Sequence, residues 1–425
     1  MSPQPLLSSS PASESQPFGE HAHAAPATLA CDLHLHSRFS GGVSPAMTIE
    51  GIAATAQRKG IDLLGTGDCL QPAWLQEIEE KMVETDSGLL RLRPDTMRTS
   101  RQELSAALWR PLHYVLSTEV CCAPRGTPRL GGIHHLLYFR SLAGVRNFRQ
   151  KVARFGDLEE GRPTLALTSR DLLSLVLEQG DGCALAPAHV LNPWYSTLGS
   201  VSGGATLDTV FGDLAPHVLA IEMGLTSTPP MCRRISSLDR HTLFCGSDAH
   251  SLENLGREYT LLDIEPGYDV LLQALRTPSN GRVSHLIKFP IQRTRYYHNW
   301  CGICRKSAPG SHCPSCGRIL AIGSHDRLEA IADRATPPTP PPHFQSLLPL
   351  ADLIGLLMNL DPKHERVRRV QQLLLHAGGD ERHILTRATA EELHRACVSD
   401  LAKAIIRQRM QPPGLLSAQQ LSFVF

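Results

Sequence analysis

The sequence lacks any apolar run that approaches the length needed to cross a bilayer, and its hydrophobic fraction of 42% is ordinary for a soluble chain. Residues 1–28 are rich in Ser, Pro and Ala, and they lack the basic start and the continuous apolar segment of a signal peptide. These absences argue against a membrane-spanning or secreted protein. We therefore expect a disordered tail over residues 1–28, a cytoplasmic location and no membrane partner.

The chain also lacks the cysteine spacing of a disulfide framework. Eight of its 12 cysteines are scattered, mostly in or beside apolar runs, as is typical of reduced, buried thiols. The other four form two Cys-x2-Cys pairs separated by eight residues. This spacing predicts one structural zinc ion in a closed tetrahedral site, within a zinc-ribbon domain at residues 283–335, held by Cys301, Cys304, Cys313 and Cys316.

No large excess of charge is present, because the formal net charge is +1. Residues 276–334 are the exception, with ten basic and three acidic side chains and with four aromatic residues interleaved from Phe289 to Trp300. Basic groups with aromatic neighbours suit a phosphate backbone whose bases are available for stacking. The alternative interpretation is a solvated basic face, and charge alone does not decide between the two.

Periodicity predicts the fold class. Between residues 29 and 276 short apolar runs alternate with helical segments, the first of which begins near Thr48 and stops at Gly60. This repetition predicts an α/β fold with a parallel sheet closed into a distorted (β/α) barrel at residues 29–282. After the zinc ribbon we expect a Pro-rich linker at 336–345 and a helical C-terminal region at 346–425.

A candidate metal site begins at the end of the first apolar strand, where His34 and His36 are spaced i, i+2. Alternate residues of a strand point to the same face, so both imidazoles can bind one metal ion. Further candidate ligands lie at the ends of later strand-like runs, and together they have the donor chemistry of a multinuclear hydrolytic site. They are Asp68, Glu119, His135, His189, Asp248 and His250.

His134 and His135 are adjacent, so on a strand they point in opposite directions. We choose His135 as the ligand because it directly precedes the apolar run Leu136–Phe139. His134 is then expected to support a ligand from behind or to pack in the core.

The ligand candidates described above, together with the sequence around them, resemble the motifs of the polymerase-and-histidinol-phosphatase (PHP) superfamily of metal-dependent phosphoesterases. More narrowly, the chain resembles the endonuclease Q family of DNA-repair nucleases over residues 31–413. The matching segments cover residues 32–40, 62–68, 116–120, 134–137, 187–190, 193–196, 211–214, 236–240, 247–251 and 255–258, together with the four-cysteine ribbon and residues 400–405.

The resemblance implies a PHP-type barrel that hydrolyses a DNA phosphodiester on the 5′ side of uracil, hypoxanthine, xanthine or an abasic site. It implies two or three divalent ions (Zn, Mn or Mg), with Asp248, Glu119 and Asp68 as the catalytic carboxylates among the ligands. The chain departs from the superfamily at residues 40–44, which offer no strong ligand, so the number of ions stays open. Two rivals are a phosphoesterase for another phosphate ester and a non-catalytic DNA-binding or scaffold protein.

DNA contacts are expected from further residues near the ligand set in the sequence. Arg38 and Arg257 are candidate phosphate contacts, and the loop after His189 offers side chains that could stack on and read a base extruded from the duplex, namely Asn192, Trp194, Tyr195 and Ser196. The alternative is that the two aromatics only pack the loop. Residues 419–425 resemble a sliding-clamp-binding tail, and a frayed apolar terminus is the alternative there.

Overall fold

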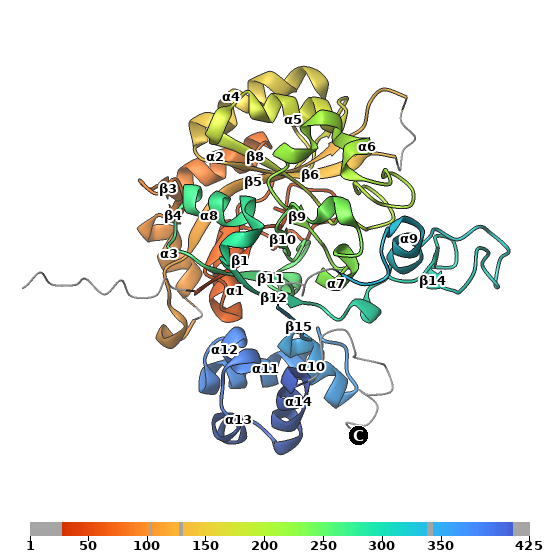
Figure 1. Ribbon diagram of the computed structural model, residues 1–425. Helices are drawn as coiled ribbons and strands as arrows, with labels where there is room; N and C mark the ends of the chain where they lie inside the picture. Colours follow the sequence, from red (N-terminus) through yellow and green to blue (C-terminus); the bar gives the residue numbers. More distant parts are fainter. Residues whose placement is uncertain (1–27, 103, 127–130, 338–342, 411–425) are drawn as a thin grey trace, which may run out of the picture.

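A computed structural model describes residues 28–102, 104–126, 131–337 and 343–410 (Figure 1). The predicted tail up to residue 27, part of the Pro-rich linker and the clamp-like residues 419–425 lie outside this range. No helix within it is long and apolar enough to span a membrane. A cytoplasmic location stays a prediction.

The larger part of the chain is an α/β barrel. Around the ring, β1 (Thr28–Asp32), β2 (Leu63–Gly65) and β5 (His113–Cys122) run parallel, and β6 (Ile133–Phe139) is antiparallel to both β5 and β8 (Cys183–Pro187). The parallel pair β9 (Ile221–Glu222) and β10 (Leu243–Phe244) follows, and a parallel bridge between Leu35 and Ala249 closes the ring. The predicted barrel is confirmed, but the wholly parallel sheet is wrong, because β6 runs in the opposite direction.

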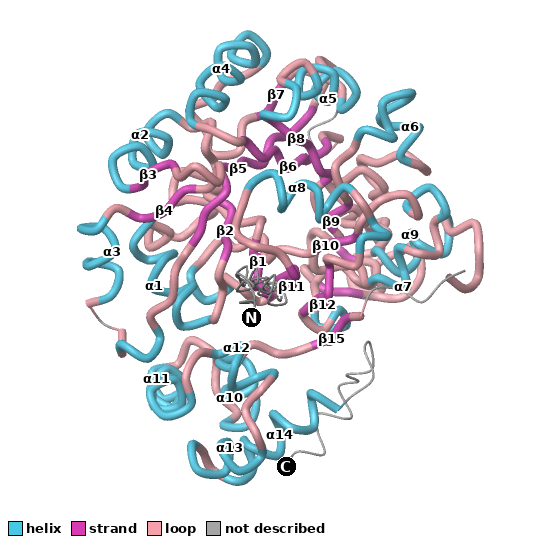
Figure 2. The backbone as a smooth tube through the Cα atoms, turned by 60° about the vertical axis from the view of Figure 1, so that its left-hand side comes forward, coloured by secondary structure: helices cyan, strands magenta, loops and turns pink. Residues whose placement is uncertain are grey.

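Helices lie outside the strands and one helix plugs one end of the ring. Figures 1 and 2 show α8 (Tyr268–Arg276) across one end of the ring of strands, where Leu271 and Leu275 pack with inward-facing residues such as Leu33 and Val115. The outer helices are α1 (Ile49–Lys59), α2 (Pro72–Lys81), α3 (Pro94–Arg101), α4 (Leu142–Val152), α5 (Ser169–Leu177), α6 (Leu207–Phe211) and α7 (Pro229–Cys232). The plug leaves the opposite rim, at the carboxyl ends of the parallel strands, for a functional site.

The first helix shows how sequence sets these boundaries. The Thr48 side chain accepts a hydrogen bond from the backbone N–H of Gly51 at the start of α1. Gly60 ends the helix with φ of 79°, a left-handed conformation that glycine adopts without steric cost. The predicted start and stop of this helix are therefore confirmed.

The sheet extends beyond the ring along one edge. β11 (Tyr259–Asp263) is antiparallel to β1, β12 (Val283–Lys288) is antiparallel to β11, and β15 (Phe344–Ser346) is parallel to β12. The predicted ribbon boundary at Val283 is therefore wrong, since β12 belongs to the main sheet. On the other edge lie β3 (Met82–Glu84) and β4 (Leu90–Leu92), and β7 (Thr164–Leu165) pairs with the end of β5.

The zinc-ribbon segment and the C-terminal helices complete the molecule. The former holds β13 (Trp300–Cys301), β14 (Lys306–Ser307) and α9 (Ser324–Ile331). The latter, at the bottom of Figure 1, comprises α10 (Leu350–Met358), α11 (Glu365–Gly378), α12 (Glu381–Thr386), α13 (Ala390–Ala396) and α14 (Ser399–Met410). A buried ion pair, Lys59 Nζ to Glu381 Oε1 at 2.8 Å, joins these helices to the barrel. The predicted helical C-terminal region is confirmed.

Candidate metal centre

One group of donors gathers His34, His36 and Asp248, whose ligand atoms all lie within 4.8 Å of one another. The two histidines follow β1 and are buried, and the backbone N–H of Asp248 donates to the carbonyl of His34. Asp248 Oδ1 lies 3.5 Å from His34 Nε2 and 3.3 Å from His36 Nε2. Closure of the barrel between β10 and β1 thus brings together residues more than 200 positions apart.

A second group gathers Glu119, His134 and His189 within the same limit. Glu119 Oε1 lies 3.0 Å from His134 Nδ1 and 3.0 Å from His189 Nε2. The other oxygen, Oε2, lies 3.4 Å from His36 Nε2 in the first group. Oε1 of Glu119 also lies 3.6 Å from His34 Nε2, so Glu119 belongs to the second group and borders the first.

The donor set fits cations. His34 Nε2, His36 Nε2 and Asp248 Oδ1 are buried and have no hydrogen-bond partner among the described residues. Burial alone would lower the pKa of His34, but Glu222, Asp248 and Glu119 raise it to about 9. Burial alone would raise the pKa of Glu119, but His134 and the other imidazoles lower it well below its usual range. The carboxylates of Glu119 and Asp248 stay ionised in this site only with positive charge close by, and divalent metals can supply that charge.

Buried carboxylates behind the imidazoles fix their orientation. Glu222, at the end of β9, lies 2.9 Å from His34 Nδ1 and accepts a hydrogen bond from the backbone N–H of His189 at 2.8 Å. Asp68 lies 3.1 Å from His36 Nδ1. In both histidines Nε2 is then turned toward the site, as is usual for metal-binding histidines.

Asp68, predicted as a metal ligand, is in neither group of the structure. Its Oδ2 accepts hydrogen bonds from the backbone and hydroxyl of Ser37 and from the hydroxyl of Ser40, at 2.7 to 3.0 Å. With Oδ1 facing His36, both oxygens are engaged in positioning. His250 is also outside the two groups, with its ring 4.7 Å from that of His36 and its Nδ1 2.9 Å from the carbonyl oxygen of Asp248.

The structure brings His134, and not the predicted His135, into the second donor group, and strand register gives the reason. Glu119 pairs with Leu136 across β5 and β6, so His134, two residues before Leu136, shares the inner face with Glu119. His135 faces outward, where its Nε2 lies 2.7 Å from the Ser169 hydroxyl and burial lowers its pKa to about 3. Because β6 runs antiparallel, its first residues lie at the rim where β5 ends.

The backbone at this rim is strained. Six non-glycine residues in the described chain have positive φ, and four of them lie at the site: Asp68, His189, Tyr195 and Asp248. Such conformations cost free energy and persist where the surrounding structure holds them, commonly at functional sites.

Sequence reasoning missed Glu222 and Arg162. Glu222 follows the apolar run Leu219, Ala220, Ile221, the same strand-end pattern that identified Glu119, so the signal was present. Arg162 lies in a loop and has no local signature, yet its Nη1 is 3.3 Å from Glu119 Oε2.

The loop after His189 lies beside the second group, with its side chains in different roles. The Tyr195 ring stacks on that of His134, with centroids 4.7 Å apart. Trp194 instead meets Tyr296 edge to face at 4.8 Å, which is a packing contact with the ribbon segment. The Ser196 hydroxyl donates to the carbonyl of Asn192, whereas the Asn192 side-chain oxygen is buried without a hydrogen-bond partner among the described residues.

The two arginines predicted to bind phosphate have intramolecular partners. Arg38 forms an ion pair with Glu77. Arg257 donates from Nε to the carbonyl of Ser247 at 2.8 Å and from Nη2 to that of Asp248 at 3.3 Å. Arg257 thus positions the loop that carries Asp248.

Several cations of the basic segment at residues 276–334 also have intramolecular partners. Lys288 is buried against Glu258, Arg327 donates to the carbonyls of Leu198 and Gly204, and Arg334 pairs with Asp239. The exposed cations in this segment include Arg293, Arg295, Arg305, Lys306 and Arg318, and Arg295 lies over the rings of Tyr296 and Trp300. The surface charge is therefore smaller than the sequence total.

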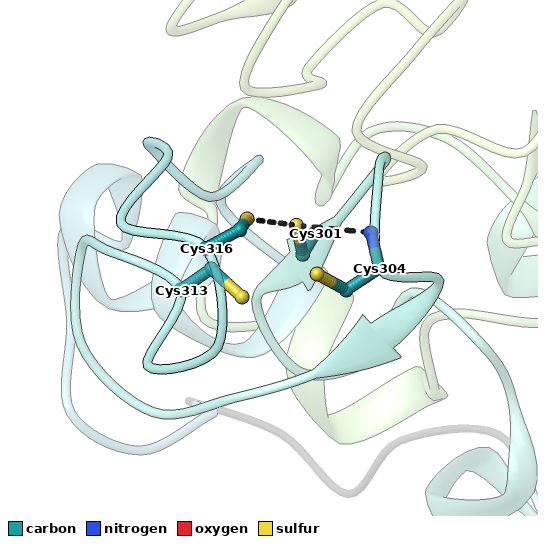
Figure 3. A group of neighbouring side chains, drawn as sticks. All are labelled: Cys301, Cys304, Cys313 and Cys316. Carbon is teal, nitrogen blue, oxygen red and sulfur yellow. Dashed lines mark hydrogen bonds between the residues drawn. The ribbon is translucent and has the colours of Figure 1, made fainter.

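The four cysteines of the ribbon converge, as Figure 3 shows, with their sulfur atoms within 4.8 Å of one another. Cys301 comes from β13 and Cys304 from the turn after it, and Cys313 and Cys316 form the second turn. Backbone N–H groups of Ser315 and Cys316 lower the pKa of the Cys313 thiol, which favours the thiolate that zinc binds. The arrangement is compatible with a zinc ribbon.

Comparison with known proteins gives two solved structures over most of the chain. The lesion-specific endonuclease PfuEndoQ from Pyrococcus furiosus is 27% identical, with a TM-score of 0.76 over 90% of this chain and 91% of that one. The complex of endonuclease Q with a 27-mer duplex that carries an abasic lesion at the active site is also 27% identical, with a TM-score of 0.78 over 90% and 92%.

The uncharacterised protein YqxK of Bacillus subtilis is 27% identical over 397 residues, which cover 89% of this chain and 94% of that protein. Comparison with protein-family models finds no match.

Proposed function

Because the chain belongs to the endonuclease Q family, we propose that it is a metal-dependent endonuclease that cuts DNA on the 5′ side of damaged nucleotides. The observation that carries the proposal is the position of Glu119, which belongs to one donor group and lies within 3.6 Å of His34 and His36 of the other, at the carboxyl ends of the barrel strands. Paired cations at such a rim are the usual arrangement for phosphodiester hydrolysis.

We assign roles to the chain's own residues. His34, His36 and Asp248 would hold one divalent ion, and Glu119, His134 and His189 would hold another. The ions, when bound, would activate water and offset charge on the phosphate. Glu222, Asp68 and Arg257 position these ligands, and the carboxylates of Glu119, Glu222 and Asp68 are buried away from bulk water. Zinc, manganese and magnesium are the candidate ions, with zinc in the ribbon.

The substrates we propose are duplexes with an abasic site or with a deaminated base, namely uracil, hypoxanthine or xanthine. An abasic lesion lies at the active site of the endonuclease Q complex, and the aromatic loop of this chain supports base recognition. Tyr195 is held beside ligand candidate His134, and the free oxygen of Asn192 could accept a hydrogen bond from a base edge. A sliding-clamp partner stays a prediction.

The test is a panel of end-labelled duplexes that carry each lesion or none, incubated with Mg²⁺, Mn²⁺ or Zn²⁺. A small phosphate monoester serves as the rival substrate. Lesion-dependent nicks should appear 5′ of the damage, and Asp248→Asn should slow them by about 10³-fold, since it removes charge from the first donor group. Equal rates for the variant, or turnover of the monoester alone, would contradict the proposal.

Base recognition has its own test. Tyr195→Ala should reduce cleavage at uracil and hypoxanthine by about tenfold, because base–aromatic stacking is worth about 1–3 kcal/mol. The loss at an abasic site should be smaller, because no base is present to stack. Trp194→Ala is the matched control, since Trp194 packs on Tyr296. Equal losses on all substrates would instead assign Tyr195 to holding His134.

A further inference from the structure

Arg162 is held at the mouth of the metal centre by backbone contacts on both sides. The Gly161 N–H donates to the carbonyl of Phe39 at 3.2 Å, beside the loop that carries His36. On the other side, the Cys121 N–H donates to the carbonyl of Pro163 at 2.9 Å, and β7 continues parallel to the end of β5. Arg162 therefore lies on a segment attached both to the His34–His36 loop and to the strand that carries Glu119.

The close approach of this segment depends on the residue before the arginine. A Cβ atom at Gly161 would lie 2.4 Å from the Ser40 hydroxyl oxygen and 2.9 Å from Asp68 Oδ2. A side chain cannot be placed there without moving both groups. Glycine thus lets the backbone pass directly over the residues that position His36.

Arg162 contacts a buried carboxylate, and its own side chain is partly exposed. Arg162 Nη1 is 3.3 Å from Glu119 Oε2, and the Arg162 side chain is 29% exposed whereas that of Glu119 is 1% exposed. The Arg162 guanidinium therefore contacts the ligand set, while part of the side chain is accessible from outside.

This contact would compete with a divalent cation held by Glu119. Oε2 of Glu119 is the oxygen nearest to His36 in the first donor group, and it is also the oxygen that Arg162 contacts. When that oxygen binds a cation, its attraction for the guanidinium falls and like charges oppose each other. An incoming phosphodiester brings an anion with two non-bridging oxygens to this position, a geometry that the planar fork of arginine matches.

We propose that Arg162 contacts the scissile phosphate, exchanging Glu119 for a non-bridging phosphate oxygen when substrate binds. The inference rests on the proposed endonuclease function. It also differs from the prediction made for Arg38 and Arg257, whose guanidinium groups pair with Glu77 and with the Ser247 and Asp248 carbonyls, respectively.

The test is a binding cycle that pairs the arginine with the charge of one phosphate. Duplexes with an abasic-site analogue are made with either a normal phosphodiester or an uncharged methylphosphonate 5′ of the lesion. Dissociation constants are measured in the Asp248→Asn background, to prevent cleavage. Arg162→Gln should weaken binding of the phosphodiester duplex by about tenfold or more, as expected for a charge-assisted hydrogen bond, and should leave the methylphosphonate duplex unchanged.

Three further measurements make the outcome decisive. Arg146→Gln removes an exposed arginine of α4 that pairs with Glu79, and it should show no coupling to the phosphate. Arg162→Lys should recover part of the affinity, because it keeps the charge but not the fork. Metal content and melting temperature of Arg162→Gln should match those of the parent.

Equal weakening on the two duplexes, or loss of bound metal in Arg162→Gln, would overturn the proposal and leave Arg162 as a partner that only positions Glu119. Failure of the parent protein to prefer lesion-containing DNA would instead count against the endonuclease function itself.

Discussion

The two candidate metal centres of this molecule are assembled over very different lengths of chain. The ribbon centre draws four sulfur donors from residues 301–316. The barrel centre draws nitrogen and oxygen donors from residues 34–248, supplied by the ends of β1, β5, β6, β8 and β10. One is a local structure that its own turns can form, whereas the other exists only when the whole barrel has closed.

The two centres also differ in how much of the surrounding protein supports their ligands. Cys301, Cys304 and Cys313 pack in a small cluster with Ala308 and Leu320, and Cys316 is exposed, so little apolar burial supports the arrangement of the ribbon cysteines. The barrel ligands stand above a large core and are oriented by Glu222 and Asp68. We infer that bound metal stabilises the fold of the ribbon, while the barrel holds its ligands in place without metal.

The largest effect on cleavage is expected from a substitution in the second donor group. His134→Gln should reduce cleavage by about 10³-fold and remove metal from the barrel, because a direct donor is lost. His135→Gln is the matched control, since the adjacent ring faces Ser169 outside the site. Elemental analysis and single-turnover cleavage are the measurements. A larger loss of metal in the His135 variant would return the ligand role to that residue.

The ribbon centre should respond more locally. Replacing Cys301 and Cys313 by Ser should remove about one zinc ion per chain and make the ribbon accessible to protease, while the barrel keeps its metal and its melting transition. Cys397→Ser, a change at a thiol outside both centres, should leave the metal content intact. Mild chelation should strip the barrel before the closed thiolate site, and the reverse order would contradict this assignment.

A smaller effect should come from a buried histidine that neither centre uses. Burial lowers the pKa of His241 to about 4, below the value of about 6.5 expected in the unfolded chain. As pH falls from about 6.5 to about 4 the unfolded chain takes up the proton first, so stability present at neutral pH is progressively lost.

His241→Gln should therefore reduce the loss of unfolding free energy between pH 7 and pH 5 by about 1–2 kcal/mol, measured by urea denaturation at both values. His376→Gln, at an exposed position of α11, is the control. An unchanged pH dependence in His241→Gln would mean that its burial does not carry this cost.

The different sequence separations of the donors in the two centres also explain which features the sequence could predict. The cysteine spacing and the alternation of strands and helices are local signals, so the ribbon motif and the barrel could be identified directly. Strand-end patterns further identified His34, His36, Glu119, His189 and Asp248, which the structure brings together.

The missing information concerned the direction and register of strands. Nothing near His134 shows that β6 runs antiparallel, and this direction places its first inner residue beside Glu119. Asp68 has the same local pattern as a ligand, and only the positions of Ser37 and Ser40 turn it into a positioning residue. Arg162 reaches the site through a loop, which has no periodicity to read.

The pairing of β12 with β15 gives the ribbon a distinct status within the chain. These two strands are neighbours in the sheet, in parallel register from Leu286 and Phe344 onward, so the segment between them is a crossover connection. The ribbon is therefore an insertion whose two ends both connect to strands of the main sheet, and not a separate domain attached through a single linker. Its loss of structure would leave both anchoring strands in the sheet, so this insert can diversify while the barrel beneath it stays closed.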